Sequence, residues 1–71
     1  MSNQGGAMNI RFNLLKKIKE NGLHQKDFAE LVGDDPSVVS RVINGVWNPG
    51  PLRKARYAKV LRCKPDEIFE D

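Results

Sequence analysis

The sequence has few of the residues from which proteins build catalytic and metal sites. Its 71 residues include one histidine, His24, and one cysteine, Cys63, in different segments of the chain. A structural metal site needs about four such ligands at close spacing, so the sequence predicts no metal site. A glycine-rich phosphate loop of the P-loop type is also missing. We therefore expect neither an enzyme nor a cofactor, and we interpret Cys63 as a small buried apolar residue.

Long hydrophobic runs are missing as well. No apolar segment approaches the roughly 20 residues that cross a bilayer, and none has the apolar centre of a signal peptide. A single cysteine cannot form an internal disulfide, which suits a reducing compartment. These absences predict a cytoplasmic protein that makes no contact with a membrane.

The length of the chain sets its organisation. A sequence of 71 residues is long enough for one domain and leaves no room for a second. Residues 1–9 are polar and glycine-rich, so we expect a disordered N-terminal tail there. The folded domain is expected over residues 10–71.

The charges are unevenly distributed around a net charge of +3. The stretch over residues 36–64 has no acidic residue, whereas acidic residues gather over residues 20–35 and in the last six positions. The basic residues of that stretch are Arg41, Arg53, Lys54, Arg56, Lys59, Arg62 and Lys64, and the first helical segment adds Arg11, Lys16, Lys17 and Lys19. This asymmetry suggests a polyanionic partner, although an ordinary solvated surface is also compatible with it.

Hydrophobic periodicity predicts an all-α fold of five short helices without strands. The expected helices cover residues 10–20, 25–32, 36–44, 51–61 and 66–70. The first, second and fourth of them have apolar faces that we assign to the core. These faces are Ile10, Leu14, Leu15 and Ile18 in the first helix, Phe28, Ala29, Leu31 and Val32 in the second, and Leu52, Ala55, Ala58 and Leu61 in the fourth. Ile68 or Phe69 is expected to close the core.

The segment over residues 25–45 contains two helices joined by a tight turn around Gly33. Asp35 can cap the second of these helices, and Pro36 suits its first helical position. At about 100° per residue, the side chains of this helix divide into two faces. Val39, Val42 and Ile43 form the apolar face, Ser37, Ser40, Arg41 and Asn44 the polar face, and Val38 lies on the flank. A helix of this kind buries one face and offers the other to a polar partner.

This pattern resembles the phage repressor and Cro family of helix-turn-helix DNA-binding domains, also called the XRE family. The resemblance covers residues 10–69 and rests on the order and spacing of several features. They are Gly22-Leu23, Gln25, Ala29, Gly33, the sequence SRVING, Asn48-Pro49, AKVL and PDEIF. The chain departs from the family pattern at Asp34, where a small apolar residue is usual, at Ile43, where glutamate is frequent, and at Arg62, where glycine is frequent.

The resemblance implies a compact, five-helix, lambda-repressor-like domain with the helix-turn-helix at its second and third helices. The implied function is that of a sequence-specific regulator of transcription that binds double-stranded DNA, with a prophage-type or Cro-like repressor as the expected setting. A single recognition helix contacts few bases, so we expect a homodimer on a pseudo-palindromic operator. The dimer surface is assigned to residues 63–71 with Phe69 as an anchor, unless Phe69 belongs to the core.

The N-terminal part of the recognition helix faces the base edges in this motif. The candidate base-contacting residues are therefore Pro36, Ser37, Val38, Ser40 and Arg41. Arg41 is the strongest, because a guanidinium can pair in bidentate fashion with guanine, although a phosphate contact or a surface salt bridge would also use it. Val38 could meet a thymine methyl group or pack partly into the core, and the small Ser40 could allow a close approach.

Four further residues are candidates for contacts with the DNA phosphates. Gln25 stands at the start of a helix, where free N–H groups attract anions, and the resemblance implies backbone contacts for both Gln25 and Asn44. Arg53 and Lys54 are close in sequence to the loop after the recognition helix. A solvated charged face is the alternative for these two, and the preferred interpretation for Arg56 and Lys59. Asp34 would place a carboxylate beside the DNA-facing helix and oppose its approach to phosphate.

Two questions stay open at this stage. Trp47 follows the recognition helix and could cover the edge of the core, touch the sugar-phosphate backbone or join a dimer contact. The chain could also be an antitoxin-type or adaptor module whose main partner is another protein. A polar outer face on the recognition helix favours DNA, whereas exposed apolar side chains there would favour a protein.

Overall fold

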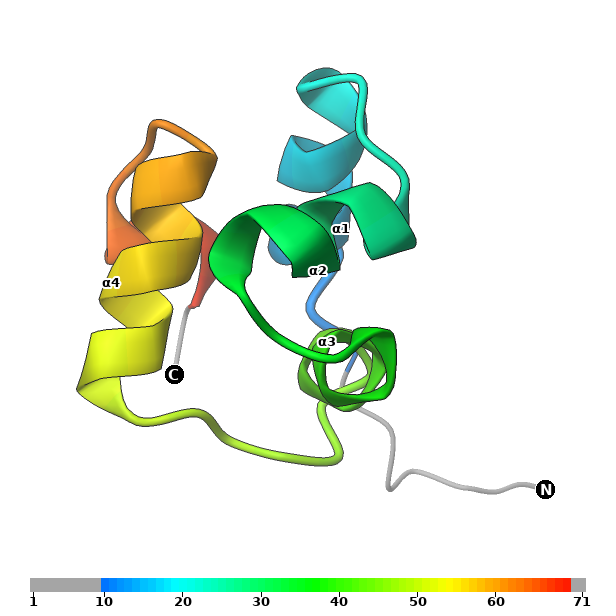
Figure 1. Ribbon diagram of the computed structural model, residues 1–71. Coiled ribbons are helices and arrows are strands. Elements are labelled where there is room, and N and C mark those ends of the chain that lie inside the picture. Colours follow the sequence, from blue (N-terminus) through cyan, green and yellow to red (C-terminus); the bar gives the residue numbers. More distant parts are fainter. Residues whose placement is uncertain (1–9, 70–71) are drawn as a thin grey trace, which may run out of the picture.

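The computed structural model describes residues 10–69, and the tail predicted for residues 1–9 lies outside this part. Five helices follow one another: α1 (Phe12–Glu20), α2 (Gln25–Val32), α3 (Pro36–Ile43), α4 (Pro51–Val60) and α5 (Pro65–Ile68). The described residues form no strand, so the all-α prediction is confirmed. In Figure 1, α3 lies below α2, and α4 stands beside them with its first turn at the level of α3.

The ends of the central helices follow from local chemistry. The side chain of Asp35 accepts a hydrogen bond from the backbone N–H of Ser37 at 2.9 Å, and Pro36 opens α3 as predicted. Gly33 ends α2 with a φ of 78°, a left-handed conformation that glycine adopts without strain. The helix-turn-helix segment therefore has the start, stop and turn residues that its geometry requires.

Helix α1 begins later than the predicted residue 10. The backbone N–H of Arg11 donates to the carbonyl of Ile43 at 2.7 Å, and Arg11 has non-helical torsion angles of φ −82° and ψ 81°. A tertiary bond to α3 thus competes with the first turn of α1 and delays its start. Helix α5, predicted over residues 66–70, is a single turn that begins at Pro65 and ends at Ile68.

The core lies where the five helices converge. Its buried side chains are Leu14, Ile18, Phe28, Ala29, Val32, Val39, Val42, Ile43, Tyr57, Ala58, Leu61, Ile68 and Phe69. The rings of Phe28 and Tyr57 meet edge to face with centroids 4.9 Å apart, which joins α2 to α4. Both Ile68 and Phe69 are buried, so the two residues proposed for closing the core act together.

Three predicted core residues, Leu31, Leu52 and Ala55, are on the surface instead. Leu31 is 59% exposed and Leu52 is 86% exposed. In α4 the helix is turned so that Tyr57, Ala58 and Leu61 face inward, which leaves Leu52 and Ala55 outside. Burying the larger Tyr57 ring removes more apolar area from water than burying Leu52 would, so the aromatic residue sets the orientation of the helix.

Arg62 occupies the position where the family often has glycine, and the backbone shows why. Its φ is 58°, the only positive φ of a non-glycine residue among residues 10–69. A side chain in this left-handed region costs about 1 kcal/mol or more, which glycine avoids. The turn between α4 and α5 therefore needs a conformation that suits glycine better than arginine.

The two leucines of α4 and its C-cap give a matched test of this core. Leu61→Ala should lower the free energy of unfolding by about 2–5 kcal/mol, because it removes buried methyl groups and leaves a cavity in their place. Leu52→Ala should change it by less than about 0.5 kcal/mol, since Leu52 is on the surface. Urea unfolding followed by circular dichroism measures both. A large loss for Leu52→Ala would contradict the orientation of α4.

Candidate nucleic-acid interface

The outer face of α3 is polar, as the periodicity predicted. Pro36, Ser37 and Arg41 are exposed, while Val38 and Ser40 are half-buried. The opposite face, made by Val39, Val42 and Ile43, is buried against the core. All five candidate base-contacting residues therefore lie on or beside one accessible surface, with Val38 at its apolar margin.

Arg41 is the side chain of this surface with the greatest freedom. It is exposed, and its guanidinium makes no hydrogen bond or ion pair with any of the described residues 10–69. The surface salt bridge considered as an alternative is therefore not formed within this part of the chain. Its five N–H donors are available to an acceptor outside the domain.

Ser37 is less free than Arg41. Its hydroxyl donates to the carboxylate of Asp35 at 2.8 Å, and its backbone N–H donates to the same oxygen. These bonds belong to the N-cap of α3 and also lower the pKa of the Asp35 carboxyl. The Ser37 oxygen retains lone pairs, so in this conformation the residue can accept a hydrogen bond from a base amino group.

Gln25 and Asn44 lie at helix ends beside this surface. Gln25 is the exposed first residue of α2, where the N–H groups of the first turn point outward. Asn44 follows the last residue of α3, and its side-chain amide donates to the Ser40 hydroxyl at 3.3 Å. A predicted phosphate contact is thus linked by a hydrogen bond to a predicted base contact.

Arg53 and Lys54 are turned toward partners within the molecule. The Nε of Arg53 donates to Asp34 at 2.9 Å, and its guanidinium carbon lies 4.7 Å from the centre of the Trp47 ring. The ammonium group of Lys54 lies 5.5 Å from the centre of the Phe69 ring. Their phosphate contacts stay a prediction, and Arg53 would have to leave its present partners to make one with its bound edge.

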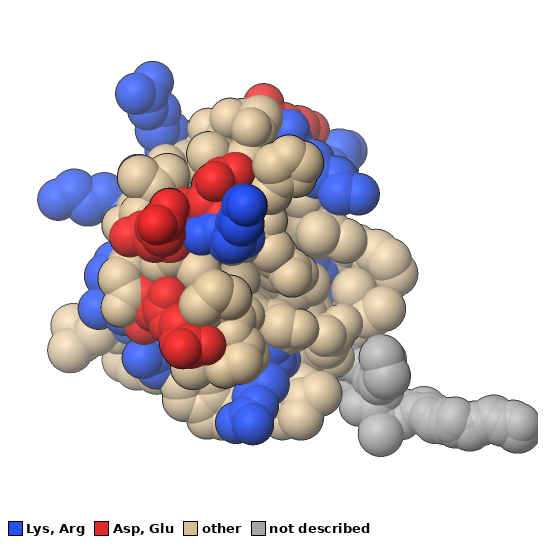
Figure 2. Space-filling model, turned by 45° about the vertical axis from the view of Figure 1, so that its right-hand side comes forward, with Lys and Arg blue, Asp and Glu red and all other residues tan. Residues whose placement is uncertain are grey.

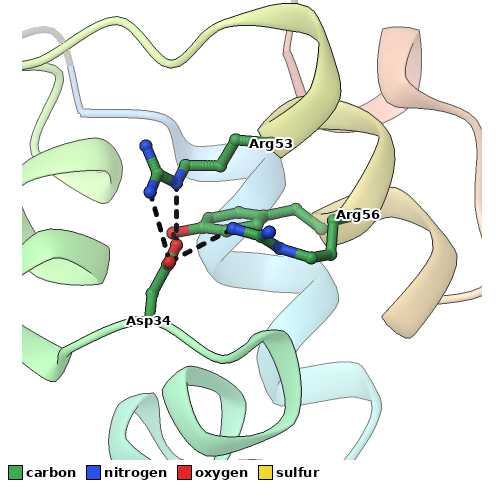
Figure 3. Close-up of polar contacts among 4 residues, drawn as sticks. Asp34, Arg53 and Arg56 are labelled. Carbon is green, nitrogen blue, oxygen red and sulfur yellow. Dashed lines mark hydrogen bonds and ion pairs between the residues drawn. The ribbon is translucent and has the colours of Figure 1, made fainter.

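Asp34 is the centre of a polar cluster that joins the turn before α3 to α4 (Figure 3). Its side chain is only 6% exposed, and four donors reach its two carboxylate oxygens. They are Arg53 Nε at 2.9 Å, Arg53 Nη2 at 3.3 Å, Arg56 Nη2 at 3.2 Å and the hydroxyl of Tyr57 at 2.9 Å. The carboxylate expected to oppose DNA is therefore neutralised from within the domain.

The cluster shifts the pKa values of both groups in it that can lose a proton, the Asp34 carboxyl and the Tyr57 hydroxyl. Burial acts to raise the pKa of the Asp34 carboxyl, but the hydrogen bonds from Arg53 and Tyr57 and the two guanidinium charges outweigh it and leave that pKa lowered. Burial and the nearby Asp34 carboxylate raise the pKa of the Tyr57 hydroxyl. Around neutral pH the cluster is one carboxylate, two guanidinium groups and a neutral phenol.

Arg11 makes a second polar cluster at the other end of α3. Its Nη1 donates to the carbonyl of Val42 at 2.7 Å and to that of Trp47 at 3.3 Å, and its Nη2 donates to the side chain of Asn48 at 3.0 Å. A cation at a helix C-terminus satisfies carbonyl groups that the helix leaves unpaired. These bonds connect the start of α1 to α3 and to the following loop. They lie near Ile43, which stands where the family frequently has glutamate.

Three residues of these clusters are not predicted by the sequence patterns. The patterns place Arg11 among the basic residues of the first helix, predict a solvated face for Arg56 and indicate no role for Tyr57. The unusual Asp34 was the one visible signal, since a carboxylate in a turn needs a partner when it is covered. The spacing of Arg53 and Arg56 in α4 does not by itself indicate that both side chains reach Asp34, because the fold brings them to that turn.

The structure shows where Phe69, Trp47 and Cys63 lie. Phe69 is 4% exposed and contacts the core, so the proposal that it anchors a dimer is wrong and its core role is confirmed. Trp47 is 40% exposed and lies against Arg53 at the edge of the domain. Cys63 is half-buried and packs on the core, close to its predicted apolar role.

The surface charges are separated in space as well as in sequence. Figure 2 shows a face on which acidic side chains gather, with basic side chains projecting mainly from its edges. A phosphate backbone would be repelled from such a face, so only part of the surface suits a polyanion.

Within the described residues, no group of histidine, cysteine and acidic side chains could hold a metal ion. None of the described helices is long and apolar enough to cross a membrane.

Together these features define a helix-turn-helix domain: α2 and α3 joined by a tight turn, and a polar recognition face on α3. A helix-turn-helix family profile matches residues 14–68, nearly all of the described chain. The protein belongs to this family, the XRE-type helix-turn-helix proteins, which are DNA-binding regulators of transcription. Comparison with curated proteins gave no significant match, and neither did comparison with solved structures.

The Asp34 cluster predicts an acid-sensitive part of the stability. Because the pKa of Asp34 is lower in the folded protein than in the unfolded chain, the folded state binds fewer protons, and stability falls as the pH drops below about 4. Asp34→Asn should lower the free energy of unfolding at neutral pH but lose less of it on acidification than the wild type does. Urea unfolding at neutral and acidic pH measures the difference, and equal acid losses would contradict it. The contribution of Asp35 is retained in both proteins and cancels.

Proposed function

We propose that the protein binds a pseudo-palindromic operator as a homodimer and regulates transcription as a Cro-like repressor. The observation that carries the proposal is the exposed polar face of α3, on which Arg41 has no partner among the described residues. The family supports DNA binding, and the outer face of α3 has the shape and chemistry to enter the major groove. Its buried opposite face holds the helix in a fixed orientation for that role.

Base recognition would be divided among the residues on and beside the outer face of α3. Arg41 would donate two hydrogen bonds to the O6 and N7 atoms of a guanine, a pair that discriminates by about 1–3 kcal/mol. Ser37, whose hydrogen is held by Asp35, would accept from the amino group of cytosine or adenine. Val38 would contact a thymine methyl group, and Pro36 and Ser40 would let the backbone come close.

The DNA backbone would be held at the ends of the two helices. The first-turn N–H groups of α2 and the side chain of Gln25 would contact one phosphate, since free N–H groups at a helix start attract anions. Asn44 would contact another while supporting Ser40 through their hydrogen bond. Such contacts fix the register of α3 without reading sequence.

A homodimer follows from the small number of base contacts that one recognition helix can make. Two copies on a two-fold symmetric site would place their α3 helices about one helical turn apart. With Phe69 buried, the dimer surface has to use other residues of the C-terminal segment or exposed apolar side chains elsewhere. Val46 and Leu52 are exposed close to the loop after α3 and are the proposed alternatives.

Selection from a randomised duplex pool at physiological salt tests this function directly. A two-fold symmetric enriched motif is the expected result, because a dimer presents the same α3 surface twice. The motif should contain a guanine in each half-site opposite Arg41. Salt-sensitive binding without any enriched motif would contradict sequence-specific regulation and leave only electrostatic affinity.

Two variants separate base reading from backbone contact. Arg41→Ala should weaken operator binding by about 1–3 kcal/mol per half-site and relax the preference at one base pair. Asn44→Ala should weaken binding to operator and random duplex alike. Fluorescence anisotropy on both duplexes measures the change, and Lys59→Ala, which removes a charge from an exposed position of α4, is the control. An unchanged preference in Arg41→Ala, or an altered one in Asn44→Ala, would contradict the assignment.

A second candidate function is a module whose main partner is another protein, as in an antitoxin or adaptor. The outer side of α1 favours it, since Phe12 is 68% exposed and lines a shallow hollow together with Leu15, Lys16 and Lys19. An apolar surface of this kind suits a protein better than DNA. Both roles can be combined, because this hollow and the outer face of α3 are lined by different residues.

A further inference from the structure

We propose that Asp34 is an internal counter-ion that withholds Arg53 and Arg56 from DNA phosphate and so limits binding to DNA of any sequence. The inference rests on the proposed function and deepens it. It turns a residue expected to repel DNA directly into one that limits the electrostatic part of the affinity by occupying two cations. The arginines would then serve the domain as partners of Asp34 and not as phosphate contacts.

The geometry of the carboxylate supports this role. Each oxygen of Asp34 receives two donors: Oδ2 from Arg53 Nε and Tyr57, and Oδ1 from the Nη2 atoms of Arg53 and Arg56. An ionised carboxylate offers about four acceptor sites, so its hydrogen-bonding capacity is filled. A carboxylate and a phosphate bind guanidinium groups in the same manner, which lets Asp34 take the place that a DNA phosphate would otherwise fill.

Arg53 is held on two sides. Its Nε and Nη2 form the edge that grips an anion in bidentate fashion, and both point at Asp34. The ring of Trp47 lies 4.7 Å from its guanidinium carbon and covers one face. Binding a phosphate with this edge would require Arg53 to break two hydrogen bonds to a carboxylate that is 6% exposed.

Arg56 is the more accessible of the two cations. Its side chain is 47% exposed and uses one nitrogen, Nη2, to reach Asp34. Figure 3 shows both arginines extending from α4 toward the same carboxylate in the turn. The three charged groups together carry a net charge of +1, whereas the two arginines alone would carry +2.

The position of the cluster makes these charges relevant to DNA. Asp34 stands directly before the N-cap Asp35, and the proposed base-contacting residues begin at Pro36. The first turn of α4 lies level with α3 in Figure 1. Two unpaired arginines here would lie beside the end of α3 that faces the bases, where DNA phosphates flank the groove.

Withheld charges reduce the electrostatic part of the affinity for DNA. Each phosphate that a protein neutralises contributes about −0.9 to the slope of log K against log salt, and this electrostatic term supplies nearly all sequence-independent affinity. Operator binding adds base contacts such as that of Arg41. Removing two potential phosphate contacts therefore lowers the electrostatic affinity for DNA of any sequence, and operator binding then depends more on the base contacts that remain.

The experiment compares the wild type with Asp34→Asn on the selected operator and on a random-sequence duplex over a range of salt concentrations. Asparagine keeps the size of the side chain and removes its charge. We expect tighter binding to both duplexes at low salt, and a slope of log K against log salt that is steeper by about one to two. Asp66→Asn, an equal charge change on the exposed surface of α5, is the control and should leave the slope unchanged.

The inference is overturned if Asp34→Asn has the same salt slope as the wild type. If the control Asp66→Asn also changes the slope, Asp34→Asn has to change it by more than the control does. If neither the wild type nor Asp34→Asn binds duplex DNA, the proposed function fails, and the inference falls with it. Binding by the wild type with an unchanged slope in Asp34→Asn overturns the counter-ion role alone. Circular dichroism at the assay temperature verifies that each variant is folded.

Arg56→Gln as a single variant supplies a second test, and this part does not depend on the folding of Asp34→Asn. Arg56 is on the surface, and its removal leaves Asp34 bonded to Arg53 and Tyr57. We expect a nearly unchanged salt slope for Arg56→Gln alone. In the Asp34→Asn background the same change should make the slope of log K against log salt shallower by about one. A drop of that size in the single variant would show that Arg56 already contacts phosphate, and it would overturn the proposal.

Discussion

The rest of the structure depends on the burial of the Tyr57 side chain, which extends from α4 and packs against α2. Its ring is fully buried and meets Phe28 edge to face, so it contributes a large apolar area to a small core. Its hydroxyl then needs a partner, because a buried donor without one is costly. Asp34 supplies that partner from the turn before α3, at 2.9 Å. One side chain thus links the packing of two helices to the place where the recognition helix begins.

Helix α3 is fastened at both ends by arginine side chains. At its N-terminal end, Arg53 and Arg56 reach Asp34 from α4. At its C-terminal end, Arg11 reaches the carbonyl of Val42 and the following loop from the start of α1. Between these ends the apolar face of α3 is buried. A helix fixed in this way loses little conformational freedom when it meets a partner, which favours binding through a preformed surface.

Local features of the fold could be predicted from the sequence, because short-range rules determine them. The cap at Asp35, the proline at the start of α3 and the division of α3 into two faces depend on residues within a few positions of one another. Leu31 and Leu52 were misplaced because apolar periodicity offers more than one inward face when a helix is short. The choice among those faces was made by Tyr57, whose size and hydroxyl matter only once α2 and Asp34 are beside it.

The polar clusters could not be predicted for a related reason. Asp34 is 19 residues from Arg53 and 23 from Tyr57, and Arg11 is 31 residues from Val42. No local pattern marks such pairs, although a carboxylate in place of a usual apolar turn residue signals that something compensates. The candidate readers of DNA on α3 were predictable because they lie on one helical face. Whether neighbouring cations are available to help them depends on tertiary contacts.

The side chains that hold the two ends of α3 lie apart from its exposed face, so the proposed base-contacting residues can be exchanged. Ser37, Val38, Ser40 and Arg41 lie outside both arginine clusters, so their identities are not tied to the bonds that orient the helix. The domain can therefore be treated as a scaffold onto which a different set of reading side chains is grafted. Two positions limit this freedom, because the N-cap bonds of Asp35 involve the backbone and the hydroxyl of Ser37, and the hydroxyl of Ser40 accepts a hydrogen bond from Asn44. A redesign that keeps small hydroxyl residues at both and varies Val38 and Arg41 would change the contacts that the outer face offers and preserve how the helix is held.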